Sequence, residues 1–302
     1  MALRNYLATE VALDHADGLL TRREALRRLG LLGLSAVAAS GLLAACGSET
    51  PPPPPSAPAT GPTSAAGSAA APGYDVAAAI ARTEAITFPG GGGTMSGAFA
   101  TAQGPRGAVL VVHENRGLTD HIRAVTGRLA GDGYTALAPD LLSRVGGTAG
   151  APDATAALGG ISSADLVADL RSGLTELGRR ASGAAVGAVG FCFGGGMVWQ
   201  LLNSGPSDLA AAVAFYGPAP DDPTFTGSGA AVLGIFAERD ARVNAGREKL
   251  ETALTAAGLT HEIVTEPGAD HAFFNDTGAR YNAAAATDAY GRTLGWFSAH
   301  LS

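Results

Sequence analysis

The chain has 302 residues, of which 16% are charged, and a formal net charge of −7. This acidic balance argues against nucleic acid as a partner, and the roughly 229 residues beyond the first 73 suffice for one domain with a substantial core. The two cysteines, Cys46 and Cys192, lie in different surroundings. We therefore expect separate functions for them, with a disulfide between them as the alternative.

Residues 1–46 are predicted to be an export signal. The segment RREALRRLGLLGLSAVAASGLLAAC at 22–46 has a basic beginning and carries no charge from Leu29 onward, which is typical of a secretory signal. The pair Arg22 and Arg23 resembles the twin-arginine type. LAAC at 43–46 resembles the lipobox of bacterial lipoproteins, which implies acylation of Cys46 and anchoring at the outer face of the cytoplasmic membrane.

Two features of the front end leave questions open. An uncleaved N-terminal membrane anchor is the alternative to a lipoprotein signal, and both place the domain outside the cytoplasm. A signal does not explain the long polar stretch before Arg22, which contains Glu10, Asp14 and Asp17.

Residues 47–73 are rich in Pro, Ala, Ser and Gly and include five consecutive prolines, so they are predicted to be an extended tether.

From residue 74 to 302, strand and helix patterns alternate. We expect two short strands within 84–102 and further strands within 107–117, 134–142, 184–192, 209–217, 231–238 and 260–268. Helices are expected within 119–133, 163–180, 194–204, 245–258 and 279–301. Repeated strand–helix units predict an α/β fold with a mostly parallel sheet and helices on both faces. In such sheets, functional sites gather at the carboxyl ends of the strands.

The stretch GFCFGGG at 190–196 has the pattern of a nucleophile elbow. Cys192 lies between Gly190 and Gly194, at the junction of a predicted strand and a predicted helix, with sulfur in the place of the usual hydroxyl. Side chains at the flanking positions would clash in so tight a turn. The N–H dipoles at the start of the following helix favour a thiolate. We therefore predict that Cys192 is a nucleophile.

A nucleophile of this kind needs an acid and a histidine that follow it in the chain. Asp240, in GIFAERDARV, comes just after one strand, and His271, in EPGADHAFFND, comes just after the last. We expect His271 to transfer protons and Asp240 to orient its ring. Asp240 as a simple turn or cap residue, and His271 as a surface histidine, are the alternatives. The rival acids are Glu238, Asp221 and Asp222, and the rival histidines are His15, His113, His121, His261 and His300.

Five segments, VVHENRG, APDLLSR, GFCFGG, ERDARV and GADHAFF, together resemble the dienelactone hydrolase family of α/β-hydrolases. The resemblance covers essentially all of residues 84–300. It implies an α/β-hydrolase fold, and it implies that Cys192, Asp240 and His271 are a catalytic triad. We expect neither a metal nor a cofactor, because no His/Asp cluster has convincing metal-ligand spacing and no glycine-rich phosphate loop with a lysine is found.

The same resemblance assigns further residues. Glu114 matches a carboxylate that contacts the resting thiol, and the backbone N–H groups of Phe193 and Asn115 are the expected oxyanion donors. Arg144 matches an arginine that binds the substrate carboxylate. Without the resemblance, Glu114 is equally well a strand cap and Arg144 a surface residue. The family's dienelactone enzymes carry a second arginine four residues after the histidine, where this chain has Asn275, so one anion contact is missing.

These observations predict a membrane-tethered, metal-independent hydrolase of small esters or lactones, some of them anionic, that works through an acyl-thioenzyme. A non-catalytic solute-binding lipoprotein that kept the pocket is the alternative. A binding protein has no need of a nucleophile, an acid and a histidine together, and their presence favours the enzyme. The sequence sets neither the natural substrate nor the oligomeric state.

Overall fold

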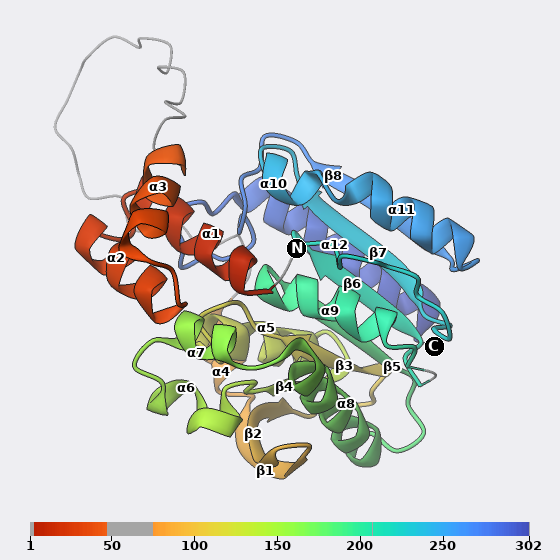
Figure 1. Cartoon of the computed structure of the whole chain (residues 1–302). Helices are drawn as coiled ribbons and strands as arrows, with labels where there is room; N and C mark the ends of the chain where they lie inside the picture. Colours follow the sequence, from red (N-terminus) through yellow and green to blue (C-terminus); the bar gives the residue numbers. More distant parts are fainter. Residues whose placement is uncertain (1–2, 47–74, 207, 302) are drawn as a thin grey trace, which may run out of the picture.

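An eight-stranded sheet runs through the molecule in the order β1-β2-β4-β3-β5-β6-β7-β8 (Figure 1). The computed structural model describes residues 3–46, 75–206 and 208–301. The strands are β1 (Glu84–Gly90), β2 (Gly93–Ala100), β3 (Gly107–Val112), β4 (Tyr134–Pro139), β5 (Val186–Phe191), β6 (Ala211–Phe215), β7 (Ala231–Ala237) and β8 (His261–Glu266). The hairpin β1–β2 is antiparallel and pairs antiparallel with β4, whereas β3 to β8 are parallel to one another.

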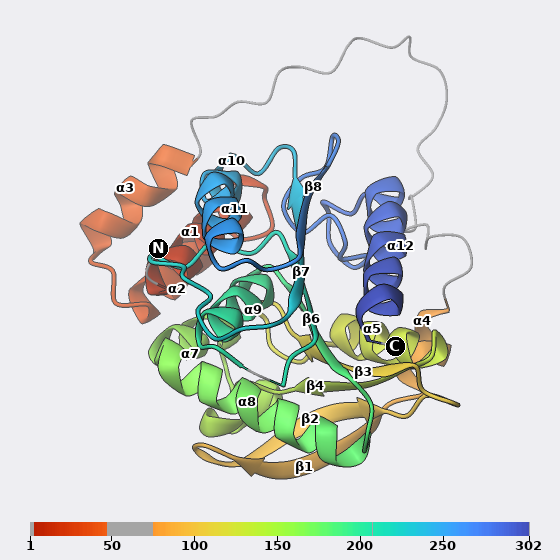
Figure 2. The same ribbon diagram turned by 90° about the vertical axis from the view of Figure 1, so that its right-hand side faces the viewer.

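Helices cover both faces of the sheet, as Figure 2 shows with the sheet nearly edge-on. One face carries α8 (Ser163–Arg180), α9 (Phe193–Asn203), α10 (Ala241–Asn244) and α11 (Arg247–Ala256), and the other carries α5 (Asp120–Gly131) and α12 (Ala283–His300). The shorter helices are α4 (Val76–Ile80), α6 (Gly147–Gly150), α7 (Ala154–Gly160) and the 3-10 turn η1 (Ser143–Val145). The predicted α/β-hydrolase fold, with a mostly parallel sheet between helices, is confirmed.

The central strands are buried on both faces because they are apolar throughout. Every residue of β3, β4, β6 and β7 is buried, which is what parallel strands covered by helices on both sides require. The strand order reverses around β3, whose neighbours are β4 on one side and β5 on the other. Such a reversal opens a crevice at the carboxyl ends of the strands, and the segments after β3 and β5 contain Glu114 and Cys192.

The N-terminal segment, predicted as an export signal separate from the domain, is folded against it. Residues 3–46 form α1 (Leu3–Ala16), α2 (Arg22–Leu31) and α3 (Ala36–Cys46). Helix α1 packs against α2, α3 and α7, and its side chains belong to the same hydrophobic core as those of the sheet. Leu3, Leu7 and Val11 are spaced four residues apart and therefore make one apolar stripe on the helix. The polar residues between these positions mask this stripe in the sequence.

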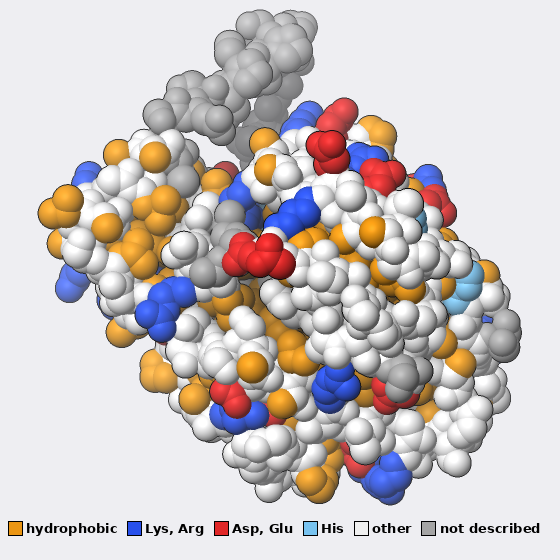
Figure 3. Space-filling model, turned by 45° about the vertical axis from the view of Figure 1, so that its right-hand side comes forward, with side chains coloured by type: hydrophobic (Ala, Val, Ile, Leu, Met, Phe, Trp, Pro, Cys, Tyr) orange, Lys and Arg blue, Asp and Glu red, His pale blue; other side chains and the backbone are white. Residues whose placement is uncertain are grey.

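The apolar part of the predicted signal is only partly covered by this packing. Leu29 is buried, whereas Leu31 and Val37 are exposed, and Figure 3 shows hydrophobic side chains gathered on the left of the molecule, over these helices. In the described part of the chain, no helix is both long and apolar enough to cross a membrane. The predicted tether, residues 47–73, lies entirely outside the described residues, and so does the side chain of Cys46.

Candidate active site

Cys192 lies at a sharp turn between β5 and α9. Its backbone has φ 56° and ψ −118°, a strained conformation for a residue with a side chain. A Cβ atom at Gly190 would collide with the backbone of Gly194, and one at Gly194 would collide with the carbonyl groups of Val112 and His113. The two glycines are therefore required by the turn, as the sequence pattern predicted. The thiol is buried and free, so it forms no disulfide with Cys46.

His271 and Asp240 meet at the ends of two neighbouring strands. Asp240 follows β7 and His271 follows β8, and the His271 Nδ1 atom is 2.5 Å from the Asp240 Oδ2 atom. The other oxygen of Asp240 accepts the backbone N–H of Val243 and so caps α10. Asp240 therefore both caps α10 and contacts the His271 ring. Both side chains are buried, and the Tyr216 ring lies edge-on to the imidazole at 5.1 Å between centroids.

The imidazole and the thiol lie close to each other. The Sγ atom of Cys192, a ring nitrogen of His271 and a carboxylate oxygen of Glu10 are all within 4.8 Å of one another. The Nε2 atom of His271 has no hydrogen-bond partner among the described residues. The structure thus brings together the three residues expected to form the triad.

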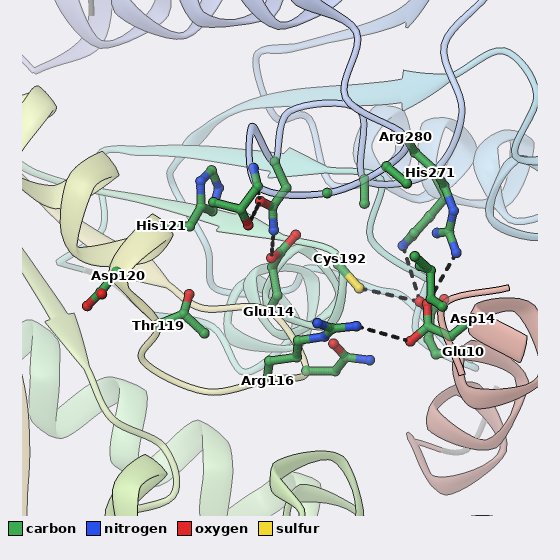
Figure 4. A pocket seen from close by; sticks show the side chains of 17 residues that line it. Glu10, Asp14, Glu114, Arg116, Thr119, Asp120, His121, Cys192, His271 and Arg280 are labelled. Atoms are coloured by element: carbon green, nitrogen blue, oxygen red, sulfur yellow. Dashed lines mark hydrogen bonds and ion pairs between the residues drawn. The ribbon is translucent and has the colours of Figure 1, made fainter. Parts of the chain in front are cut away.

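Helix α1 supplies a fourth and a fifth group to this cluster. Tyr6 Oη lies 3.1 Å from Cys192 Sγ, in a buried hydrogen bond in which either atom can donate. Cys192 Sγ is 3.8 Å from Glu10 Oε2, and that same oxygen is 3.5 Å from His271 Nε2. Figure 4 shows the Glu10 side chain reaching from α1 to the thiol and the imidazole. Both α1 side chains are buried.

Arg242 holds the second oxygen of the Glu10 carboxylate. Its guanidinium forms a charge-assisted hydrogen bond with Glu10 Oε1 and lies over the Tyr6 ring, 4.6 Å from the centroid. The remaining guanidinium atoms Nε and Nη1 are buried without a hydrogen-bond partner among the described residues. Burial lowers the pKa of Arg242 and the neighbouring charge of Glu10 raises it. The effect of the charges is larger, so the pKa is raised.

Burial and the neighbouring charges shift the pKa values of all three triad residues. Burial lowers the pKa of His271, but the negative charges of Glu10, Cys192 and Asp240 outweigh it and raise that pKa well above its usual value. Burial and the Glu10 carboxylate raise the pKa of the Cys192 thiol, against the opposing effect of His271. Burial opposes ionisation of Asp240, but the hydrogen bond to His271 prevails and lowers its pKa. The Glu10 carboxylate of α1 thus raises the pKa of both groups between which the thiol proton would pass.

Glu114 lines the cavity, but its hydrogen bond goes to a partner other than the thiol. The amide Nδ2 of Asn275 donates to Glu114 Oε2 at 2.6 Å. The carboxylate that comes within reach of Cys192 Sγ is that of Glu10. Asn275, which stands where the family's dienelactone enzymes have an arginine, is thus the residue that holds Glu114 at the wall of the cavity.

The two expected oxyanion donors lie beside the nucleophile. Phe193 is the first residue of α9, where a backbone N–H has no acceptor within its own helix. Asn115 follows Glu114 in the loop after β3 and lines the same cavity as Cys192. Their assignment as oxyanion donors stays a prediction.

Arg144 does not line this cavity, contrary to its expected place at a substrate carboxylate. Its guanidinium donates to both oxygens of Asp169 on α8, at 2.6 and 2.9 Å, and forms an ion pair with Asp165. The family-like segment PDLLSR is present, but two acids on α8 neutralise its arginine. The lining residues that carry positive charge are Arg116 and Arg280.

The rival residues have other partners. His113 bonds the carbonyl of Glu114 and the amide of Leu141, and His121 pairs with Asp276. Glu238 accepts the backbone N–H of Gly268. Asp240 and His271 are the acid and the histidine that the fold brings to Cys192.

The cavity above the thiol has a volume of about 330 Å³. Its walls come from α1, from the loops after β3 and β8 and from the start of α5, and they include Glu10, Asp14, Glu114 and Cys192. Asp14 on α1 pairs with Arg280 at 3.2 Å and with Arg116 at 3.7 Å (Figure 4). The acids of α1 thus face arginines across the cavity.

Glu10, Cys192 and His271 are also the set of three side chains in the described residues that could hold a metal ion. The atoms of Glu10 and His271 that face away from the cluster are held by Arg242 and Asp240, respectively.

Sequence reasoning missed Tyr6, Glu10 and Arg242. The signal for the first two was the polar stretch before Arg22 that an export signal leaves unexplained. Arg242 lies two residues after Asp240, within the family-like segment ERDARV, but nothing in that spacing indicates a partner more than two hundred residues earlier in the chain.

Comparison with known proteins agrees with this arrangement. Residues 95–301 match the dienelactone hydrolase family. The chain is 32% identical to a putative carboxymethylenebutenolidase of Synechocystis over 242 residues, which cover 73% of this chain and 98% of the relative. A putative carboxymethylenebutenolidase of Saccharolobus solfataricus is 30% identical, with 68% of this chain and 95% of the relative covered.

A solved structure supports the same assignment. The crystal structure of a putative dienelactone hydrolase from Klebsiella pneumoniae has a TM-score of 0.65 and 33% sequence identity, and the match covers 72% of this chain and 98% of that one. The family segments, the sheet and these relatives agree. The chain therefore belongs to the dienelactone hydrolase family and is a hydrolase of the class that acts on ester or lactone bonds.

Proposed function

We propose that the protein hydrolyses small carboxylic esters or lactones through a Cys192–His271–Asp240 triad and an acyl-thioenzyme. The observation that carries this proposal is the convergence of a strained, glycine-flanked thiol, an imidazole within 4.8 Å and a carboxylate at 2.5 Å from the imidazole. These contacts support the proposal, because the chemistry needs a nucleophile, a base and an acid that orients the base.

The reaction follows from these positions. His271 Nε2 takes the thiol proton as Cys192 Sγ attacks the carbonyl carbon, and the resulting tetrahedral oxyanion is stabilised by the backbone N–H groups of Phe193 and Asn115. When the carbon–oxygen bond of the ester breaks, the imidazolium returns the proton to the leaving oxygen. The products of this half are an alcohol and a thioester on Cys192. A lactone gives the same thioester with the alcohol still attached to the acyl group.

Water then completes the cycle. His271 takes a proton from water as its oxygen attacks the thioester carbon, and the carbon–sulfur bond breaks. The sulfur recovers its proton from the imidazolium, and the carboxylic acid leaves. Asp240 stabilises the imidazolium in both halves and fixes the ring so that Nε2 faces the reacting atoms.

The cavity sets the class of substrate. About 330 Å³ lies at the small end of the range for small-molecule sites. We therefore propose a compact acyl group. Removal of α1 would free Arg116 and Arg280 from Asp14, and these arginines would then favour a substrate with negative charge over a neutral one of the same size.

We also propose that the protein is exported and anchored by a lipid on Cys46. What supports this is the sequence: the arginine pair before an apolar stretch, and LAAC at its end. The exposure of Leu31 and Val37 on the surface of the N-terminal helices fits a segment that other machinery must reach. Release of residues 1–45 would then also remove α1 from the active site.

The triad is tested with p-nitrophenyl acetate and dienelactone as substrates of the full chain. The measurement is made in the natural sequence and in a Glu10→Ala background, so that α1 does not conceal activity. We expect Cys192→Ala to lower kcat by at least about 10³-fold in both backgrounds. The matched control is Cys46→Ala, which replaces the other cysteine. Equal activity of Cys192→Ala and the parent would contradict the proposal, as would a lack of turnover in both backgrounds.

A further inference from the structure

Glu10 of α1 places a carboxylate at the point in the molecule where a substrate must react. One of its oxygens is 3.8 Å from Cys192 Sγ and 3.5 Å from His271 Nε2, and the other is bound by Arg242. This carboxylate is buried beside a buried nucleophile. Because isolated buried charges are very costly, such an arrangement depends on the guanidinium that accompanies it.

Arg242 has features of a binding residue that a structural arginine does not need. It sits at the start of α10, two residues after the triad acid, so the same strand end positions both. Its Nε and Nη1 atoms are buried and have no hydrogen-bond partner among the described residues. A guanidinium can bind a carboxylate with two parallel N–H bonds, and Glu10 uses only part of that capacity.

The other side chains of α1 complete a ligand-like set. Tyr6 covers the sulfur with its hydroxyl and covers Arg242 with its ring. Further along the helix, Asp14 binds Arg280 and Arg116 at the opposite wall. Together they leave Arg242 outside the lining of the remaining cavity, because α1 lies over it.

We propose that Arg242 is the residue that binds the carboxylate of an anionic ester substrate, and that Glu10 occupies this place as an internal competitor when α1 is docked. The substrate is then a small ester or lactone whose acyl part carries a carboxylate a few bonds from the scissile carbonyl. Arg242 takes the anion-binding function that Arg144, engaged with Asp169, does not serve here. This inference rests on the proposed function, because it concerns the orientation of a substrate toward Cys192.

The first experiment compares two esters of similar size on the full chain. Mono-p-nitrophenyl glutarate carries a carboxylate on its acyl group, and p-nitrophenyl valerate does not. We expect Glu10→Ala to raise kcat/KM for the anionic ester at least about tenfold more than for the neutral ester. The matched control is Glu24→Ala, which removes a glutamate of the same N-terminal segment that pairs with Arg27 and Arg28 at the surface.

The second variant isolates Arg242. In the Glu10→Ala background, we add Arg242→Gln and expect the ratio of the two kcat/KM values, anionic over neutral, to fall at least about tenfold, mainly through KM for the anionic ester. Arg242→Lys, which keeps the charge without the planar fork, is expected to recover part of that ratio. A ratio unchanged by Arg242→Gln overturns the proposal.

A third measurement does not depend on catalysis. The rate of Cys192 alkylation by iodoacetamide is followed in Glu10→Ala at increasing concentrations of glutarate, which we expect to protect the thiol. Adding Arg242→Gln should remove this protection, with folding checked by circular dichroism. Protection without turnover of either ester would contradict the proposed function while supporting the assignment of Arg242. No protection in Glu10→Ala, or equal protection with and without Arg242, overturns the assignment itself.

Discussion

The two sides of the active site are held together by different kinds of force. On the sheet side, Cys192, Asp240 and His271 follow three strands whose backbone bonds and glycine contacts leave them one position each. On the α1 side, the contacts to the site are ion pairs and one tyrosine that meet the cavity from a separate helix. The triad is therefore fixed by the sheet itself, whereas the groups of α1 reach the site from a helix that also packs on the hydrophobic core through its apolar side.

The largest effect is expected on the sheet side, from Asp240→Asn. The amide keeps the shape of the side chain but loses the charge that orients and stabilises the imidazolium, so kcat should fall about 10³- to 10⁴-fold. The measurement is steady-state hydrolysis of p-nitrophenyl acetate in the Glu10→Ala background. Glu238→Gln, a nearby acid outside the cluster, is the control, and an equal loss in the two variants would show that Asp240 has no special part.

Gly194→Ala tests how rigid the sheet side is. Its Cβ atom would meet two backbone carbonyl groups, which cannot move without displacing β3, so we expect a loss of about 2–4 kcal/mol in the free energy of unfolding. Gly291→Ala on α12 is the matched control, because a Cβ there meets nothing within 4 Å and alanine favours the helix by about 1 kcal/mol. Urea unfolding separates the two, and a neutral Gly194→Ala would contradict the fixed turn.

Glu10→Gln tests the α1 side through pH. His271 must be neutral to accept the thiol proton, so activity rises as the pH passes upward through its pKa. Glu10 is one of the charges that raise this pKa. Its removal should therefore move the acid limb of kcat/KM to lower pH. Glu24→Gln should leave the limb in place, and an unmoved limb in Glu10→Gln would mean that α1 does not influence the imidazole.

Glu266 on β8 shows what happens to a buried glutamate without a close arginine. Burial and the neighbouring Asp288 raise its pKa to about 7, with Arg292 4.0 Å away and opposing them weakly. The folded protein thus holds this proton more tightly than the unfolded chain, so the contribution to stability is full below about pH 4.5 and is lost as the pH rises through 7. Glu266→Gln should be more stable than the parent by about 1–2 kcal/mol at pH 8 and equal to it at pH 4, as measured by urea unfolding.

The triad on the sheet could largely be predicted from the sequence, whereas the contacts of α1 with the site could not. Apolar strands and a glycine-flanked cysteine are local patterns, so they predicted the elbow at Cys192 and the chain order of Asp240 and His271. Glu10 and Arg242, which form a contact, are 232 positions apart in the chain. The residues around each of them give no indication of the other as its partner. The predicted place of Arg144 at the substrate site was wrong for the same reason. Its partner Asp169 lies on a different helix and is not part of the motif that contains Arg144.

The location of α1 also has a consequence for timing. A segment built into the same chain meets the active site at an effective concentration that no free metabolite of ordinary abundance matches, even if its own affinity is weak. Once the backbone between them is severed, that advantage disappears and the fragment dilutes away. If the proposed export signal is removed, each active centre would therefore lose its internal competitor in one irreversible step.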